Sequence, residues 1–313
     1  MLSPEVKESL KKALHVGNDI SIDRSYNPWI LEPLVPHKAI TIIDGLGGSG
    51  KSWLAADLSY SISLGLDFLG LFPVKRSGVV LYLTAEEPKE VFVQRLDMIQ
   101  KHYPKNEYFK WISFLDQNLE MTSYLCRKRR GEQIVTETAE ALEYLISEEK
   151  PLLVVLDSLI NYFGLDENSS EDAAFFYDVL KYFIRKYQVS FLVLHHQNKE
   201  AMKTQGDDII SFRGSGVLRE QARSRLVYKN IKINEKTIAR KLRLEKSNYY
   251  SKLKDELLTD GSIYLKFEGG VHIYDKAFEL TARRAEEEAK NKGKKKGKSK
   301  KGNDGIEEYE VDF

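Results

Sequence analysis

Residues 45–52 constrain the fold of this chain more than any other stretch of the sequence. They read Gly-Leu-Gly-Gly-Ser-Gly-Lys-Ser, a full match to the phosphate-loop pattern G-x-x-x-x-G-K-[ST]. A run typical of a buried strand, 37–44, precedes the motif, and a helical run begins after it at residue 53. The sequence therefore predicts a strand, a glycine loop and a helix in that order, the local structure that holds the phosphates of a nucleotide.

The motif predicts a site for ATP and Mg²⁺ and gives its residues different roles. Its glycines allow successive backbone N–H groups to converge on phosphate oxygens. Lys51 is expected to bring positive charge to the β- and γ-phosphates, and Ser52 to provide a hydroxyl ligand for Mg²⁺. The residues expected at the nucleotide are Gly45, Gly47, Gly48, Ser49, Gly50, Lys51, Ser52 and Trp53.

Further apolar runs predict an α/β fold with a mostly parallel, twisted sheet and helices on both faces. Several of these runs end abruptly on polar residues, and the carboxyl ends of parallel strands meet at one sheet edge, where ligands bind. The expected strands of this core are 37–44, 77–85, 109–114, 152–158 and 189–194.

Strand-like runs also follow this core. They cover 226–233 and 237–244, and residues 263–274 read as a hairpin around Gly269-Gly270. The sequence therefore predicts β-hairpin additions on the C-terminal side.

Glu86 is the candidate general base. It directly follows the run 77–85, and a carboxylate at that place can orient and deprotonate the water that attacks the γ-phosphate. The alternative is the acidic first turn of a helix near Pro88, a role that we assign to Glu87. Arg95 either holds the catalytic carboxylate before nucleotide arrives or is an ordinary surface charge.

Two other strand ends carry candidate site residues. Asp157 ends an apolar run as a Walker B aspartate does, and would hold Mg²⁺ opposite Ser52. His195 and His196 follow 189–194, where a polar group can contact the γ-phosphate and move when it is lost. A metal site is the alternative for the histidine pair, although no third ligand at metal spacing is visible.

Composition excludes several classes of protein. The 48 basic and 47 acidic side chains give a net charge of +1, so affinity for nucleic acid has to come from local patches. The single cysteine, Cys126, excludes an internal disulfide and a cysteine-based zinc site. Because no signal-peptide pattern and no apolar run of about 18 residues is present, we expect a cytoplasmic protein without a membrane partner.

Charge and hydrophobic patterns divide the chain into three parts. Residues 1–34 form an arm with a short amphipathic helix, which packs either on a neighbouring subunit or on its own. Residues 35–285 form the nucleotide-binding domain. Residues 286–313 are expected to be a disordered lysine-rich linker with an acidic end.

One basic cluster lies inside the domain, at Arg127-Lys128-Arg129-Arg130. We interpret it as a solvated charge run, with contact to phosphates as the alternative, because no aromatic residue alternates with the charges.

Together, the phosphate loop, Glu86, Asp157, the histidine pair and the segment Arg213-Gly214-Ser215 resemble the RecA-like hexameric ATPases, most closely the plasmid RepA-type replicative DNA helicases. The resemblance covers residues 30–250. It implies that Lys51 and Ser52 bind ATP with Mg²⁺, that Glu86 is the general base, that Asp157 is the Walker B acid and that His196 senses the γ-phosphate.

The resemblance also implies residues that act across a subunit interface. In the family an arginine after the Arg-Gly-Ser motif reaches the neighbour's nucleotide, and Arg223 is the best match, with Arg213 second. Lys246 and Asn248 resemble a Lys-x-Asn element at the same interface. The sequence departs from the family at Gly216 and in the tail 286–313.

The resemblance implies a ring-forming, hexameric helicase that translocates on single-stranded DNA by ATP hydrolysis. The alternatives are a RecA-like regulatory or recombination ATPase that binds DNA without unwinding it, and a nucleotide-gated loader or adaptor. Glu86 speaks against the last alternative, because a pure switch needs no positioned base.

Two further expectations concern partners. The loop 198–212 is expected to line a central channel and hold single-stranded DNA through its cations Lys199 and Lys203. The acidic end 302–313 docks on a partner such as a primase or polymerase, or competes with DNA for the protein's own basic channel. The alternative is that it only solubilises the chain.

Overall fold

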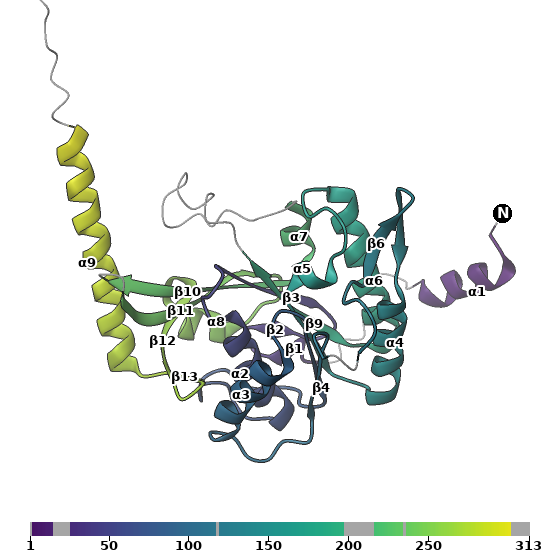
Figure 1. The fold of residues 1–313 in the computed structure, drawn as a ribbon, viewed down its shortest axis with the longest axis horizontal. Coiled ribbons are helices and arrows are strands. Elements are labelled where there is room, and N and C mark those ends of the chain that lie inside the picture. The colour runs from purple at the N-terminus through teal and green to yellow at the C-terminus, as the bar shows by residue number, and fades with distance from the viewer. Residues whose placement is uncertain (1, 15–25, 117–118, 197–215, 234–235, 302–313) are drawn as a thin grey trace, which may run out of the picture.

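The computed structural model describes residues 2–14, 26–116, 119–196, 216–233 and 236–301. Among these residues, nine strands form one central sheet in the order β13-β12-β11-β10-β3-β9-β8-β4-β5 (Figure 1). Neighbouring strands from β10 to β5 are parallel, and those from β10 to β13 are antiparallel. The strands are β3 Ile40–Gly45, β4 Val80–Thr84, β5 Phe109–Ser113, β8 Leu153–Asp157, β9 Ser190–His196, β10 Ser224–Ile233, β11 Lys236–Ser247, β12 Ser262–Glu268 and β13 Val271–Ile273. The predicted α/β fold with a mostly parallel sheet is confirmed.

Helices cover both faces of this sheet, because its strands alternate apolar side chains between two cores. Helices α2 (Lys51–Leu64) and α3 (Lys89–Gln100) pack on the face that includes Ile43 and Val155. On the other face, α4 (Glu137–Glu149) and α6 (Ser170–Tyr187) pack against the alternate strand residues, such as Ile42 and Val154. Burial on both faces explains why the parallel strands read as nearly continuous apolar runs.

The N-terminal part divides differently from the expected arm 1–34. Strands β1 (Trp29–Leu31) and β2 (Val35–Pro36) are buried and pair with each other, so the folded body begins before residue 35. Helix α1 (Pro4–Ala13) has no buried residue.

The C-terminal part also differs from expectation. Helix α9 spans Lys276–Lys301, so residues 290–301 are helical rather than disordered, and a boundary at 285 falls inside a helix. The helix is anchored by Ala282 and Glu286, which are buried against β10 to β12, and its lysines and alanines have high helix propensity. The acidic end 302–313 lies outside the described residues.

Shorter elements complete the chain. The hairpin predicted around Gly269-Gly270 is confirmed as β12 and β13, whereas the ribbon β6 (Cys126–Arg129) and β7 (Glu132–Val135) was not predicted. Short helices are α5 Leu159–Tyr162, α7 Gly216–Gln221, α8 Lys252–Leu257 and a 3-10 turn at Thr259–Gly261.

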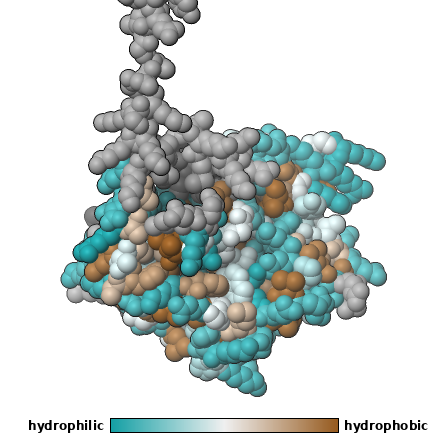
Figure 2. All heavy atoms as spheres, turned by 60° about the vertical axis from the view of Figure 1, so that its left-hand side comes forward, coloured by the Kyte–Doolittle hydropathy of each residue, from teal (hydrophilic) through white to brown (hydrophobic). Residues whose placement is uncertain are grey.

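Hydrophilic residues predominate on the face that Figure 2 brings forward, with hydrophobic residues in separate small groups. Across the described part of the chain, no helix combines the length and the apolar character needed to span a bilayer.

Candidate nucleotide site

The phosphate loop joins β3 to α2 as predicted. Gly48 and Gly50 adopt left-handed φ angles of 72° and 95°, which L side chains rarely adopt. Gly45 is required for a different reason, because a Cβ at this position would lie 2.4 Å from the carbonyl oxygen of Tyr228 on β10. The loop therefore depends on glycine both for its turns and for its close approach to the neighbouring strand.

Strand register brings the candidate residues to one edge of the sheet. Gly45 lies opposite His196 on β9, and Asp157 on β8 lies opposite Thr84 on β4. Thr84 is two residues before Glu86. The predicted meeting of the phosphate loop, Glu86, Asp157 and His196 at the carboxyl ends of the strands is therefore observed.

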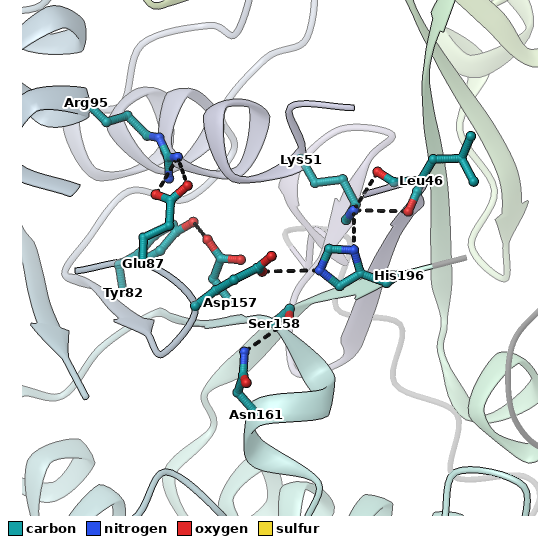
Figure 3. A network of polar contacts seen from close by, with 11 residues as sticks. Leu46, Lys51, Tyr82, Glu87, Arg95, Asp157, Ser158, Asn161 and His196 are labelled. Carbon is teal, nitrogen blue, oxygen red and sulfur yellow. Dashed lines mark hydrogen bonds and ion pairs between the residues drawn. The ribbon is translucent and has the colours of Figure 1, made fainter. Parts of the chain in front are cut away.

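Lys51 is buried at the centre of this edge, with a residue exposure of 4%. Its ammonium donates to the carbonyl oxygens of Gly45 at 3.0 Å and Leu46 at 3.1 Å, and lies 3.1 Å from Nδ1 of His196 (Figure 3). Burial lowers the pKa of Lys51, and the negative charges of Glu86 and Asp157 oppose this effect.

His196 joins Lys51 to the candidate base. Its Nε2 lies 3.1 Å from Oε2 of Glu86. Since an ammonium can only donate, Nδ1 of His196 accepts from Lys51, and Nε2 carries the proton that is donated to Glu86. The hydrogen bond from His196 is the main cause that lowers the pKa of Glu86, against the effect of burial. Glu86 is thus kept as a carboxylate, the form that a general base needs.

Asp157 is buried beside the start of α2, with an exposure of 1%. Its Oδ2 accepts a hydrogen bond of 2.7 Å from the Tyr82 hydroxyl, and the hydroxyl of Ser52 also acts on its pKa. Burial raises the pKa of Asp157, and the hydroxyls of Tyr82 and Ser52 oppose the rise. Its Oδ1 is buried without a hydrogen-bond partner among the described residues. A buried carboxylate oxygen left free beside a serine hydroxyl fits the oxygen donors that Mg²⁺ prefers.

A cavity of about 280 Å³ opens beside these groups. Glu86 and His196 line it together with Ser158, Ile160, Asn161 and Glu167. The cavity therefore provides space for a reacting group in contact with the candidate base.

The structure contradicts both alternatives for Arg95, which is buried and pairs with Glu87. Its guanidinium forms an ion pair with Glu87 at 2.5 Å, not with Glu86 (Figure 3). It also stacks on the ring of Trp53, 5.0 Å from the ring centroid. Glu87 is therefore more than a first-turn acid of α3, because it pairs with an arginine that is 6% exposed. Trp53 also packs edge-on against Phe267, so Arg95 and Trp53 support the start of α2 from its side.

The two adjacent histidines have different environments. His195 is buried, and its Nδ1 lies 2.8 Å from Asp44, which in turn pairs with Arg225. Arg225 also pairs with Glu245 at 2.8 Å. Within the part of the chain that the structure describes, no group of three potential metal ligands is present. The sequence places Asp44 and Arg225 next to apolar strand residues, which indicates that they are buried. It does not show which residues they pair with.

The expected interface residues lie at the opposite edge of the sheet. The backbone N–H of Arg223 donates to Ile40 at the start of β3, and its side chain is exposed. Asn248 donates its N–H to the carbonyl of Arg223, and Lys246 donates to the carbonyl of Glu220. Arg223, Lys246 and Asn248 are thus close together and away from the phosphate loop. Lys199, Lys203 and Arg213 lie outside the described residues.

Comparison with known proteins identifies the family. A family model described as an AAA domain matches residues 7–202, a stretch that contains the phosphate loop, Glu86, Asp157 and His196. No curated protein matches the chain. The matched stretch covers more than half of the 313 residues. The chain therefore belongs to the AAA domain family and is a P-loop ATPase with a RecA-like core.

Proposed function

We propose that this ATPase is a ring-forming replicative DNA helicase, which translocates on single-stranded DNA by hydrolysing ATP at the interfaces between subunits. The observation that carries the proposal is the separation of two sets of residues on opposite edges of one sheet. The phosphate loop and the base lie at the carboxyl edge, and Arg223 and Lys246 lie at the amino edge.

This separation excludes Arg223 from the site of its own subunit. Strand β3 runs from Ile40, beside Arg223, to Gly45 at the phosphate loop, a distance of about 16 Å at roughly 3.3 Å per residue. The exposed arginine therefore acts on a nucleotide only if that nucleotide is bound by another subunit. A ring satisfies this requirement for every subunit, because head-to-tail contacts close on themselves. A hexamer is the ring that the resemblance favours.

The residues of one subunit provide the first half of the chemistry. Glu86 accepts the proton of the attacking water, and Lys51 moves from its backbone carbonyls to the β- and γ-phosphates. Ser52 and Asp157 would hold Mg²⁺, which neutralises charge on the phosphates. His196 contacts both Lys51 and Glu86, so its position depends on whether Lys51 is engaged by a phosphate. This dependence makes His196 the proposed sensor of the γ-phosphate.

The next subunit provides the second half. Arg223 neutralises the charge that develops on the transferred phosphoryl group, and Lys246 supports it at the same interface. Arg213 remains the second candidate for this role. Lys199 and Lys203, in the loop 198–212, are proposed to hold single-stranded DNA in the channel of the ring, and 302–313 to dock on a primase or polymerase.

Strand displacement tests the proposal. The full chain is incubated with ATP, Mg²⁺ and a forked duplex carrying a fluorophore and a quencher, and release of the labelled strand is followed. Glu86→Gln serves as the matched control, because it keeps the fold and size of the side chain but lacks the base. ATP-dependent release by the wild-type chain alone is expected. ATP hydrolysis stimulated by DNA without strand release would instead identify a regulatory or recombination ATPase.

A further inference from the structure

The ribbon formed by β6 and β7 presents two faces of different character. Its strands pair antiparallel from Cys126 opposite Val135 to Arg129 opposite Glu132, and the turn is made by Arg130 and Gly131 at positive φ. In Figure 1 the ribbon lies next to α6, at the end of the molecule away from α9. Residues 126–135 contain four basic side chains and one acidic side chain.

The inner face of the ribbon is anchored to the body through one buried carboxylate. Asp172 on α6 pairs with Lys128 at 2.7 Å and accepts a hydrogen bond of 2.6 Å from Gln133. Burial would raise the pKa of Asp172, but the hydrogen bonds from Lys128 and Gln133 lower it overall. Lys128 and Gln133 are cross-strand partners, so this single anchor fixes both strands.

The anchor determines where the other arginines point. Successive side chains of a strand alternate between its two faces, so Arg127 and Arg129 lie on the face opposite Lys128, about 7 Å apart along the strand. Both are exposed, and neither forms an ion pair with another described residue. Two guanidinium groups on one projecting face, held apart by the pleat, match a polyanion with regularly spaced charges.

The surroundings of the ribbon restrict where such a polyanion can bind. A hollow of about 470 Å³ separates Arg127 from the segment after α5. Asp166 and Glu167 also line this hollow, and they repel phosphates. Tyr124, two residues before β6, also lines this hollow, and its exposed ring is one on which a base can stack. The ribbon itself, rather than the hollow, therefore offers the favourable surface.

The ribbon is also connected to the catalytic site. The residues before β6 are hydrogen-bonded to α5, because Ser123 donates to the carbonyl of Asn161 at 2.5 Å and the N–H of Leu125 donates to Tyr162 at 2.9 Å. Asn161 in turn donates to the hydroxyl of Ser158, which directly follows Asp157 (Figure 3). A displacement of the ribbon therefore reaches the Walker B strand through two hydrogen-bonded steps.

We infer that the β6–β7 ribbon is a nucleic-acid-binding arm, in which Arg127 and Arg129 contact the phosphodiester backbone and the bonds through Asn161 couple that contact to ATP hydrolysis. The inference rests on the proposed function and deepens it, because it assigns a contact outside the loop 198–212. It replaces the interpretation of this cluster as a solvated charge run.

A pair of double variants tests the contact. Arg127→Gln with Arg129→Gln removes both outer arginines, and Arg185→Gln with Arg284→Gln removes two exposed arginines elsewhere that have the same charge. The full chain is titrated onto fluorescent single-stranded DNA, duplex DNA and single-stranded RNA at several salt concentrations, and anisotropy is recorded. We expect the ribbon variant to bind more weakly and the slope of log K against log salt to fall by up to about 1.4 on single strands. The control pair is expected to bind as the wild-type chain does.

Each outcome of this titration bears on the inference. If the wild-type chain binds nucleic acid and the ribbon variant binds with the same affinity and slope, the contact is overturned while the proposed function stands. A wild-type chain that binds none of the three polynucleotides overturns both. A ribbon variant with unchanged binding but a smaller assembly mass would show that the arginines contact a second copy of the chain instead. Thermal unfolding checks that both double variants are folded.

A third variant tests the coupling. Ser123→Ala removes the hydrogen bond to Asn161 and leaves both arginines in place. It is expected to bind DNA as the wild-type chain does but to lose most of the stimulation of ATP hydrolysis by DNA. Full stimulation of ATP hydrolysis by DNA in this variant would overturn the coupling. A wild-type chain whose ATP hydrolysis is not stimulated by DNA would overturn it as well.

Discussion

His196 is the residue at which the nucleotide-binding lysine and the candidate base meet. Its Nδ1 contacts Lys51 and its Nε2 contacts Glu86, each at 3.1 Å. Because both partners carry full charges, the imidazole is polarised from both sides and its tautomer is fixed. A phosphate that draws Lys51 away removes one of these contacts. The ring then depends on Glu86 alone, which links phosphate occupancy to the position of the base.

Replacement of the base separates binding from chemistry. In Glu86→Gln the side chain keeps its size and can still contact His196, but it no longer accepts a proton. We expect ATP binding within a few-fold of the wild-type value and turnover lower by about 10²–10⁴-fold. Steady-state hydrolysis and equilibrium binding of a fluorescent ATP analogue measure the two effects. Wild-type turnover in this variant would remove Glu86 from the role of base.

The hydrogen bond from His196 sets the pH at which the base becomes protonated. This bond lowers the pKa of Glu86, so its loss in His196→Ala raises that pKa. Since the base works as a carboxylate, the acid limb of kcat/KM for ATP hydrolysis should move to higher pH. His102→Ala is the control, because His102 is exposed and its ring forms a hydrogen bond with the carbonyl of Gly269, away from the candidate site. An acid limb that stays in place in His196→Ala would contradict the assignment.

The residues of the site differ in how far the sequence could predict them. Glu86, Asp157 and His196 follow apolar strand runs, and the rule that parallel strands end at one edge was enough to bring them together. Tyr82 lies within such a run, and nothing in the pattern indicates that its hydroxyl reaches Asp157. Neither alternative given for Arg95 describes its pairing with Glu87, for a related reason. Two adjacent glutamates point in different directions, and only the structure shows which one the arginine meets.

At the scale of elements, the C-terminal hairpin is fastened to the nucleotide-binding helix by a buried polar cluster. Asp57 on α2 accepts hydrogen bonds from the backbone N–H of His272 at 2.7 Å and from its Nδ1 at 2.8 Å. His272 also contacts the hydroxyl of Tyr228 at 2.6 Å, and Tyr228 packs against Gly50 of the phosphate loop. The hairpin therefore supports helix α2 directly through Asp57 and the phosphate loop indirectly through Tyr228.

Loss of Asp57 should be costly, because its partners would remain buried. In Asp57→Ala the backbone N–H and the Nδ1 of buried His272 lose their acceptor. We expect the free energy of unfolding to fall by about 3 kcal/mol or more. Asp97→Ala, which removes an exposed acid of α3, should stay within about 0.5 kcal/mol of the wild-type value. Urea unfolding measures the free energy of unfolding of both variants. Equal free energies would show that the cluster does not fasten the hairpin.

Helix α9 is attached through a carboxylate with a strongly lowered pKa. Burial raises the pKa of Glu286, but the hydroxyl of Tyr264 and the charges of Lys241 and Lys229 lower it to about 2. A carboxyl group with a lowered folded-state pKa stabilises the protein above its unfolded-state pKa of 4.5, and this contribution disappears as the pH falls toward 2.

The stability difference between the wild-type chain and Glu286→Gln should therefore depend on pH. We expect it to be largest at neutral pH, up to about 3 kcal/mol, and to shrink as the pH falls from 4.5 toward 2. Urea unfolding at pH 7, 4 and 3 measures it. A difference that is the same at all three values would mean that Glu286 keeps an ordinary pKa.

Elements were predictable where pattern and turn chemistry agree. The hairpin of β12 and β13 follows from alternating residues around two glycines at positive φ. The ribbon of β6 and β7 was missed because Arg127 to Arg129 lack the apolar alternation that marks a strand, and its stability comes instead from Asp172 far along the chain. Helix α9 was not predicted, because the density of lysines was interpreted as disorder, although it does not exclude a helix.

At the scale of the whole molecule, the proposed assembly divides one active site between two chains. In this proposal, one subunit contributes Lys51, Ser52, Glu86 and Asp157, and the next contributes Arg223. Each subunit of a ring therefore offers a complete site only with its neighbour's help. Arg223→Ala should lower turnover by about 10³-fold, because the charge of the transition state is no longer neutralised. Its ATP binding through Lys51 should persist.

Mixing two inactive proteins tests this division directly. Neither Glu86→Gln nor Arg223→Ala alone distinguishes a shared site from a single-chain site, because both are expected to be inactive. A mixed ring, however, places some intact Glu86 sites next to an intact Arg223, and those sites should hydrolyse ATP. We expect partial recovery of ATP hydrolysis that rises to a maximum near equal proportions of the two variants. Native mass spectrometry has to verify that mixed rings form. Mixed rings without recovered hydrolysis would show that Arg223 does not complete the neighbour's site, and the exposed arginine at the amino edge would then belong to the fold and not to the chemistry.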